Sequence, residues 1–101
     1  MRSYFVQITE TAIKDIETIH NYIAYELFAP ETADKYIKGV FDAINHLANY
    51  GGAVAVSQRE SLLKKYGNTV RGINYKKMAI IYTLKNNTIT VKRIIAGTLI
   101  L

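Results

Sequence analysis

The sequence predicts a single α+β domain over residues 1–101, in the order β-α-α-β-β-β, with a helical hairpin packed on one face of a mainly antiparallel sheet. Three observations lead to this prediction. Two stretches in the first half repeat apolar residues every three or four positions, as amphipathic helices do. Three short runs in the last third are rich in β-branched and aromatic residues, which favour strands. A chain of 101 residues can fill one hydrophobic core and is too short for two.

Residues 3–8 are the first expected strand, because Tyr4, Val6 and Ile8 alternate with more polar neighbours. The helix that follows should run for about four turns. Thr9 or Thr11 can cap it by accepting a hydrogen bond from an orphaned backbone N–H. Its apolar stripe consists of Ala12, Ile16, Ile19, Ile23 and Leu27.

The second expected helix begins at Pro30, because proline fits the first turn of a helix and breaks its interior. The link is so short that the two helices should pack antiparallel as a hairpin. Gly51 and Gly52 should end the second helix in the left-handed conformation. The loop after them has no clear period, although residues 61–66 favour one helical turn held to the core by two leucines. The stripe of the second helix consists of Ala33, Ile37, Val40, Ile44 and Leu47.

Residues 70–96 are expected to form a three-stranded meander with polar breaks at residues 74–77 and 85–88. Asn86 and Asn87 tolerate positive φ, which a two-residue type I′ turn needs. The middle strand has apolar residues on both faces, so it should lie inside the sheet. One face carries Met78, Ile80, Tyr82 and Leu84, and the other carries Ala79, Ile81 and Thr83.

The charge is divided between the two halves of the chain. Residues 1–50 contain four Lys or Arg and seven Asp or Glu, a net charge of −3. Residues 51–101 contain nine Lys or Arg and the single acid Glu60, a net charge of +8. Such an asymmetric field attracts polyanions or an acidic protein partner. The alternative is that these residues only solvate the outer face of the sheet.

Several function classes are excluded or disfavoured by composition. Half of the residues are hydrophobic, which excludes disorder, and no apolar run approaches the roughly 20 residues of a membrane span. The absence of cysteine excludes disulfides and thiolate zinc sites. His20 and His46 lie in different expected helices, so we expect structural roles for them and no metal site. No nucleophile elbow, P-loop or dinucleotide fingerprint is present, so no cofactor is expected.

The basic residues of the meander are the candidate functional side chains. Arg93 interrupts the apolar positions Ile89, Val91 and Ile95 on its own face of the last expected strand, where an unpaired charge would cost several kcal/mol. It must therefore point into a concave site or pair with an acid, for which the candidates are Asp15, Glu17 and Asp42. Tyr82 is expected to be a core residue. The candidate basic patch is Arg71, Lys76, Lys77, Lys92 and Arg93, with Tyr66 and Tyr75 as candidate aromatic contacts.

Three segments, together with the order of the elements, resemble the ParE/RelE superfamily of type II toxin–antitoxin toxins. They are YFVQITETAIKDIETIHNYI, LFAPETADKYIKGVFDAINHL and VRGINYKKMAIIYTLKNNTITVKRII. The long helical hairpin is more similar to the ParE branch than to the RelE branch. The matching signals are Ala12, Asp15, Ile16, Ala33, Arg71 and Tyr82.

The resemblance implies a toxin that a cognate antitoxin neutralises. ParE-like members inhibit DNA gyrase, whereas RelE-like members cleave mRNA on the ribosome with basic side chains. Ala79 stands where RelE-like nucleases carry an arginine, and the apolar residues 97–101 stand where they carry basic or aromatic ones. Gyrase inhibition is therefore the leading activity and endoribonuclease cleavage the alternative. A third reading is a degenerate member that is not toxic and only binds an antitoxin-like peptide.

Three further expectations concern the surroundings of the chain. No N-terminal segment has the pattern of a signal peptide, so a cytoplasmic location is the default. The oligomeric state stays open between a homodimer and a toxin–antitoxin hetero-oligomer. The apolar ending, residues 97–101, should form an additional strand or a tail that binds a partner.

Overall fold

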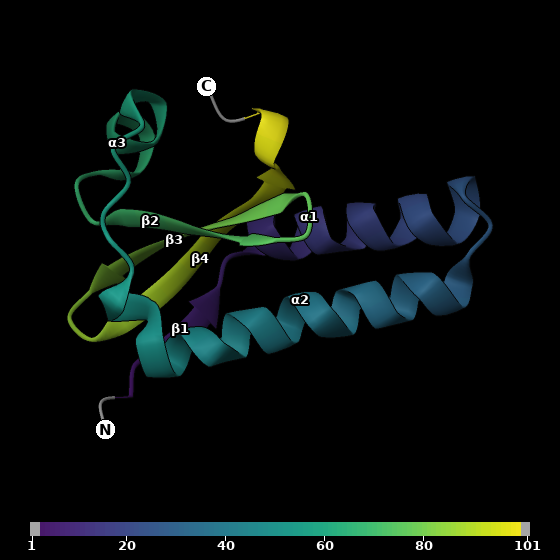
Figure 1. The fold of residues 1–101 in the computed structure, drawn as a ribbon, viewed down its shortest axis with the longest axis horizontal. Coiled ribbons are helices and arrows are strands. Elements are labelled where there is room, and N and C mark those ends of the chain that lie inside the picture. The colour runs from purple at the N-terminus through teal and green to yellow at the C-terminus, as the bar shows by residue number, and fades with distance from the viewer. Residues whose placement is uncertain (1–2, 100–101) are drawn as a thin grey trace.

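The computed structural model describes residues 3–99 and confirms an α+β fold with a helical hairpin on one face of a four-stranded sheet (Figure 1). Its main elements are β1 (Phe5–Ile8), α1 (Glu10–Asn21), α2 (Pro30–Tyr50), α3 (Glu60–Tyr66), β2 (Val70–Tyr75), β3 (Met78–Lys85) and β4 (Thr88–Ala96). The sheet order is β1-β4-β3-β2, with β1 parallel to β4 and the other neighbours antiparallel. None of the helices within residues 3–99 combines the length and hydropathy that crossing a membrane requires.

β3 is buried on both faces, which confirms its predicted place inside the sheet. Toward α1 and α2, Ile80 and Tyr82 join the main core. On the opposite face, Ala79 and Ile81 pack with Leu62 of α3. The short helix α3 therefore covers the second face of the sheet, and its predicted attachment through leucine is confirmed.

Both hairpin turns of the meander contain two residues. Asn86 and Asn87 have φ values of 51° and 64°, which confirms the predicted positive φ at both positions. The first turn is narrower than the expected break at residues 74–77, because strand pairing continues until only Lys76 and Lys77 remain. Lys76 has a φ of 53°, a conformation that costs a residue with a side chain of this size of order 1–3 kcal/mol.

Helix α1 begins as predicted and ends differently. Thr9 is its cap, since the N–H of Ala12 donates to Thr9 Oγ1 at 3.1 Å. After Asn21 the chain makes a π-helical turn over Tyr22–Glu26. The wider turn rotates the later residues, so that Ala24 is buried while Leu27 is exposed. The predicted stripe is therefore wrong for Leu27.

The expected left-handed glycine cap of α2 is also wrong. Gly51 has a φ of −55° and opens a 3-10 turn over Gly51–Ala53. The glycine is needed for space instead, because a Cβ at Gly51 would overlap the side chain of Ile89. The carbonyl oxygen of Gly51 accepts a hydrogen bond from the buried hydroxyl of Tyr82 at 2.7 Å. Close packing of the sheet, and not backbone conformation, selects this glycine.

Residues 97–99, the last that the structure describes, do not add a strand to the sheet. Gly97–Leu99 forms a 3-10 turn, and the N–H of Gly97 donates to the carbonyl oxygen of Lys77 at 2.9 Å. The expected strand is therefore wrong for these residues. Residues 100–101 of the expected tail lie outside the described residues.

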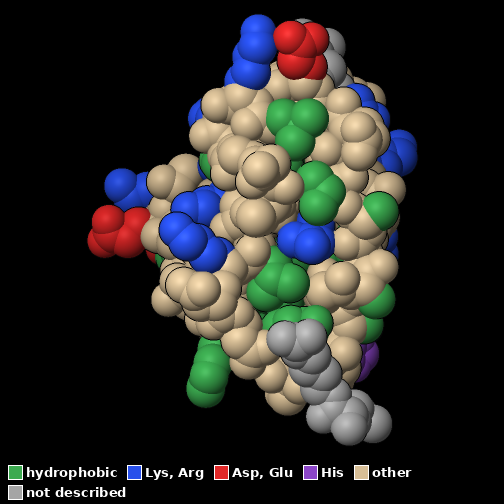
Figure 2. Space-filling model, turned by 90° about the vertical axis from the view of Figure 1, so that its left-hand side faces the viewer, with side chains coloured by type: hydrophobic (Ala, Val, Ile, Leu, Met, Phe, Trp, Pro, Cys, Tyr) green, Lys and Arg blue, Asp and Glu red, His purple; other side chains and the backbone are tan. Residues whose placement is uncertain are grey.

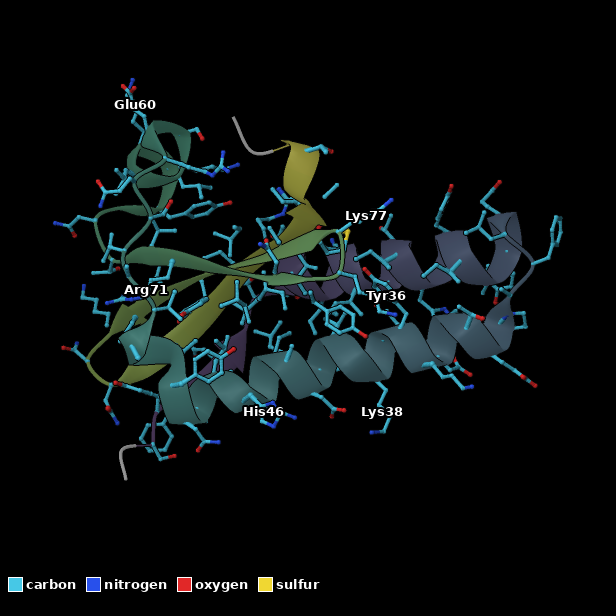
Figure 3. The ribbon with its side chains drawn as sticks, in the orientation of Figure 1. Tyr36, Lys38, His46, Glu60, Arg71 and Lys77 are labelled. Atoms are coloured by element: carbon cyan, nitrogen blue, oxygen red, sulfur yellow. The ribbon has the colours of Figure 1, made fainter. Side chains whose placement is uncertain are left out.

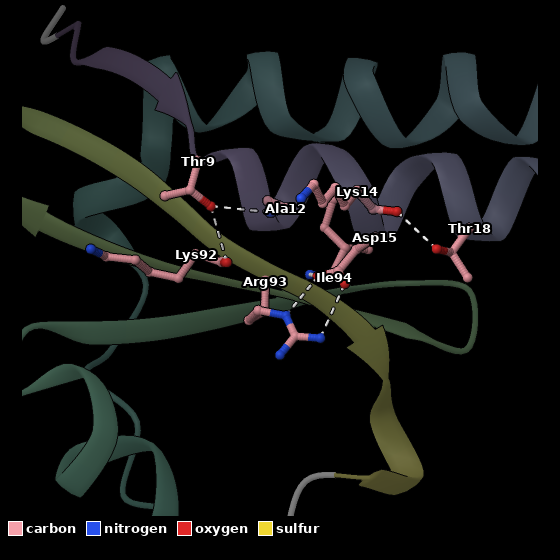
Figure 4. A network of polar contacts seen from close by, with 8 residues as sticks. All are labelled: Thr9, Ala12, Lys14, Asp15, Thr18, Lys92, Arg93 and Ile94. Atoms are coloured by element: carbon pink, nitrogen blue, oxygen red, sulfur yellow. Dashed lines mark hydrogen bonds and ion pairs between the residues drawn. The ribbon is translucent and has the colours of Figure 1, made fainter.

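Beyond its pairing with β1, the edge of β4 is hydrogen-bonded by side chains of α1 and its cap and not by a strand. β1 pairs with Thr88 to Val91, so within residues 3–99 the next residues of β4 have no strand partner on that side. The carboxylate of Asp15 accepts a hydrogen bond from the N–H of Ile94 at 2.9 Å, and the hydroxyl of Thr9 donates to the carbonyl oxygen of Lys92 at 3.2 Å (Figure 4). Two side chains of α1 and its cap thus replace a strand.

Asp15 also pairs with Arg93, which is one of the two alternatives that the sequence left open. The guanidinium donates from Nε to Oδ2 at 2.7 Å and from Nη2 to Oδ1 at 3.0 Å (Figure 4). Arg93 is opposite Ile81 because Lys92 is an extra residue, a β-bulge, in the pairing of β3 and β4. The expectation that Arg93 shares a face with Val91 is therefore wrong.

Asp15→Ala should lower the free energy of unfolding by about 2–4 kcal/mol, because it removes three hydrogen bonds to a charged acceptor. Arg93→Ala should cost less, because Asp15 would still accept from Ile94. Urea unfolding would measure both values. Asp42→Ala is the control, since Asp42 is exposed and its ion pair with Lys38, at 3.3 Å, lies at the surface. Equal losses for all three variants would contradict the edge role of Asp15.

Tyr82→Phe should lower the free energy of unfolding by about 1–2 kcal/mol at neutral pH, because it leaves the carbonyl oxygen of Gly51 without its buried donor. Tyr50→Phe, on an exposed tyrosine, should be nearly neutral. Burial raises the pKa of Tyr82 to about 12 from an ordinary value of 10.0. The folded protein therefore holds this proton more tightly than the unfolded chain, and stability should fall as the pH rises from about 10 to 12. Denaturation at several alkaline pH values should show a shallower fall for Tyr82→Phe.

Candidate functional site

The five residues of the candidate basic patch do not gather in one place. Arg71 is near the start of β2 and Lys76 is in the turn at its end, about 16 Å farther along the strand at 3.3 Å per residue. Figure 3 shows Arg71 and Lys77 at opposite ends of the β2–β3 hairpin. Lys92 and Arg93 are at the bulge of β4, two strands away. The candidate patch is therefore three separate groups.

Arg71 fastens a loop to the sheet. Its Nε donates to the carbonyl oxygen of Val54 at 2.8 Å, and its Nη1 donates to that of Thr69 at 2.9 Å. Val54 follows α2 directly after the 3-10 turn, so the guanidinium ties this loop to the first residues of β2. The contacts that the structure shows for Arg71 are thus structural.

Lys92 and Arg93 border a small cavity of about 290 Å³ between the bulge of β4 and α3. Tyr66 and Lys65 of α3 line its other side, with the Lys65 Nζ 5.6 Å from the centre of the Tyr66 ring. The hydrogen bond to Asp15 raises the pKa of Arg93, so its charge is fixed and directed at that carboxylate. Tyr66, a candidate aromatic contact, is thus brought beside two of the candidate cations.

Tyr75, Lys76 and Tyr36 form an aromatic and cationic group where the β2–β3 turn meets α2. The two rings are edge to face, with centres 5.2 Å apart. The Lys76 Nζ lies 5.4 Å from the Tyr36 ring and 5.7 Å from the Tyr75 ring, within the range of cation–π attraction. Gly39 permits this packing, because a Cβ there would overlap the Tyr75 hydroxyl. Burial of its hydroxyl raises the pKa of Tyr36, and electrostatic repulsion from the neighbouring Tyr75 raises this pKa further.

A groove of about 790 Å³ begins beside this group and runs between the helical hairpin and the β2–β3 turn. We call it the hairpin groove. Aliphatic and aromatic side chains supply most of its surface, and two lysines stand on one wall. Such a lining suits an amphipathic segment whose apolar side enters the groove and whose acidic side chains reach the lysines. The groove is lined by Thr18, Ile19, Tyr22, Ile23, Leu27, Tyr36, Lys76, Lys77 and Met78.

Most of the residues that line this groove were not singled out from the sequence. The apolar periodicity placed Ile23 and Leu27 in the core, because a regular helix would have turned them there. It did not single out Tyr36, whose role depends on the approach of β2 to α2. The signal that could have found the groove was the surplus of apolar residues in residues 22–28 for a helix with one buried face.

The two histidines lie on different helices of the hairpin. His20 Nε2 is 3.0 Å from Asp34 Oδ1 across the helical hairpin. His46 is exposed on α2, where Figure 3 shows it on the side away from the sheet. No group of three or more potential metal ligands occurs in the part of the chain that the structure describes.

The end of the molecule at the left of Figure 1 is mainly basic. Figure 2 shows Lys and Arg side chains distributed among hydrophobic ones on this face, with acidic side chains only near its margins. The distribution agrees with the net charge of +8 of residues 51–101. Because the basic groups are spread out, the face has an attractive field for anions without one dominant arginine cluster.

Comparison with known proteins gives a family for this fold. A family model described as the ParE toxin of the type II toxin–antitoxin system parDE matches residues 6–98. No curated protein matches the chain. Among solved structures, the chain is similar to the chromosomal ParDE toxin–antitoxin system from P. aeruginosa, with a TM-score of 0.76 and 18% identity over 93% of this chain and 96% of that chain.

A second similar structure is the RelBE2 toxin–antitoxin complex from Mycobacterium tuberculosis. Its TM-score is 0.58 and its identity 14%, over 93% of this chain and 98% of that chain. At such identities both likenesses show the fold alone, and the family rests on the model match. Since that match covers nearly the whole sequence, the chain belongs to the ParE toxin family of type II toxin–antitoxin systems.

Proposed function

We propose that this type II toxin acts by inhibiting DNA gyrase, the activity that its resemblance to the ParE branch implies. The observation that carries the proposal is the state of the two arginines of the candidate patch. Arg93 is paired with a carboxylate, and Arg71 is bound to two backbone carbonyls. Neither is arranged to meet a phosphodiester, so a mechanism that needs no cleavage chemistry fits the chain better.

Ribosome-dependent cleavage of mRNA is the alternative activity. It requires a cation that neutralises the developing charge on the phosphate and a group that activates the 2′-hydroxyl. Ala79, at the position where the RelE branch carries an arginine, is 4% exposed and packs against Leu62. Ala79 also borders a cavity of about 230 Å³ with Ser57 and Asn74 on its walls, and alanine supplies no charge to this cavity. The absence of an arginine at position 79 therefore supports inhibition over cleavage, and a member that is not toxic is the third alternative.

Purified toxin should inhibit the supercoiling of relaxed plasmid by DNA gyrase and should leave ribosome-bound mRNA intact. An agarose-gel supercoiling assay and a primer-extension assay in a reconstituted translation reaction would measure the two activities. Codon-specific cleavage with unaffected gyrase would reverse the order of the two proposals. Absence of both activities and of growth arrest would favour the member that is not toxic.

We further propose that a cognate antitoxin occupies the hairpin groove. Both similar structures are toxin–antitoxin systems, which supports a partner of that kind. The groove offers a long apolar surface beside Lys76 and Lys77, so an amphipathic helix with acidic side chains fits it. Addition of a strand to the free edge of β2 is the second mode, but Ser57 already donates to the carbonyl oxygen of Val70 at that edge, at 2.8 Å.

Lys77→Glu should weaken antitoxin binding about 5- to 10-fold, because it places a like charge beside the acidic side chains of the partner. Lys85→Glu is the matched control, since Lys85 is an exposed lysine at the far end of β3, the strand that begins directly after Lys77. Calorimetric titration at low and moderate salt would compare the two variants. Equal affinities would show that the antitoxin does not use the groove and would favour the strand mode.

A further inference from the structure

The far end of the helical hairpin exposes an unusual amount of apolar surface. We call residues 22–31 the hairpin tip. Phe28 is 86% exposed and Tyr25 is 69% exposed, and Tyr22 and Leu27 are exposed beside them. The tip projects away from the sheet at the right of Figure 1, so no other part of the described chain covers it. Contiguous exposed apolar groups of this kind mark interaction surfaces in soluble proteins.

The backbone of the tip adopts uncommon conformations, and they leave these side chains exposed to solvent. The π-helical turn of Tyr22–Glu26 follows α1 directly, and π-helical turns are rare and occur often at functional sites. Phe28 has a φ of 54°, a conformation that is an outlier for an aromatic residue. Its ring gains almost no burial in return. The strained conformation of Phe28 therefore does not improve packing within the domain. We take it to indicate that the Phe28 side chain contacts another molecule.

The charge of the tip is opposite to that of the hairpin groove. No Lys or Arg occurs in residues 15–34, while Glu26 and Glu31 belong to the tip and Asp34 follows one turn later. Carboxylates beside exposed aromatic rings form a surface that suits arginine and lysine side chains, which stack on the rings and pair with the acids. An acidic antitoxin segment would be repelled here and attracted to Lys76 and Lys77.

We infer that the hairpin tip is the docking surface for a basic protein target, which inserts arginine or lysine side chains between the tip aromatics and carboxylates. The inference rests on the proposed function, because it assigns the tip to the target of the toxin and the groove to the antitoxin. The toxin then has two adjacent interaction surfaces of opposite charge. Antitoxin bound in the groove, which Tyr22 and Leu27 also line, blocks the target by covering the base of the tip.

The test is a double variant, Tyr25→Ser/Phe28→Asn, in the full chain. Asparagine tolerates the left-handed backbone of position 28, so the fold should be retained. Phe5→Ser is the matched control, because Phe5 is a 74% exposed aromatic residue on β1, at the other end of the molecule. The measurements are half-inhibition of gyrase supercoiling, growth arrest on induction in cells, antitoxin affinity and melting temperature.

We expect the double variant to need at least about tenfold more toxin for half-inhibition, the scale of losing an interface hot spot. It should also fail to arrest growth, and its antitoxin affinity should stay within about threefold of that of the unmodified chain. The charge-reversed Glu26→Lys/Glu31→Lys variant should behave in the same way. Activity equal to that of Phe5→Ser overturns the inference, and so does a loss of antitoxin affinity that matches the loss of activity.

Failure of the proposed function gives a different result. If the unmodified toxin arrests growth without inhibiting gyrase, gyrase is not the target, and the growth assay alone decides the role of the tip. A tip variant that then still arrests growth overturns the inference, and one that does not supports docking of another basic target. If the unmodified toxin does not arrest growth and leaves gyrase unaffected, the inference fails together with the proposed function.

Discussion

The carboxylate of Asp15 fixes the helical hairpin to the sheet, and the other functional features depend on that attachment. It replaces a strand at the edge of β4 and at the same time neutralises the guanidinium of Arg93. A partly buried charge pair of this kind is costly to break from one side only, because the remaining partner stays desolvated. The attachment holds α1, which supplies Thr18 and Ile19 to one wall of the hairpin groove, against the sheet.

Much of the fold follows from local patterns. The second amphipathic repeat, the position of Pro30 and the asparagine turn at residues 86–87 appear where the sequence places them. The first repeat begins its helix as predicted but does not extend it to Leu27. The errors occur where tertiary packing overrides a local rule. Gly51 was assigned a backbone role and instead makes room for Ile89, and the rotation caused by the π-helical turn exposes Leu27. Neither effect has a periodic signature in the sequence.

The candidate site was harder to predict than the fold. The sequence shows that Lys and Arg concentrate in the meander but not that they separate into three groups. The distribution depends on which face each residue occupies, and one bulge at Lys92 moves Arg93 to the other face. The pairing of Arg93 with Asp15 was one of two alternatives, because Asp15 is 78 residues away in sequence and only the complete sheet brings them together. The role of Tyr36 required the same long-range information.

The parallel pairing of β1 with β4 has a consequence for biosynthesis. β1 is the first of the four described strands to be made, yet its neighbour in the sheet is the last of the four, and Thr9 contacts Lys92 across 83 positions. At translation rates of about 5–20 residues per second, the amino-terminal helices must wait several seconds for the strand that completes their core. Contacts between such distant segments also fold slowly. A nascent chain therefore cannot complete its sheet until β4 emerges, which leaves an interval in which a partner can meet the chain while it folds.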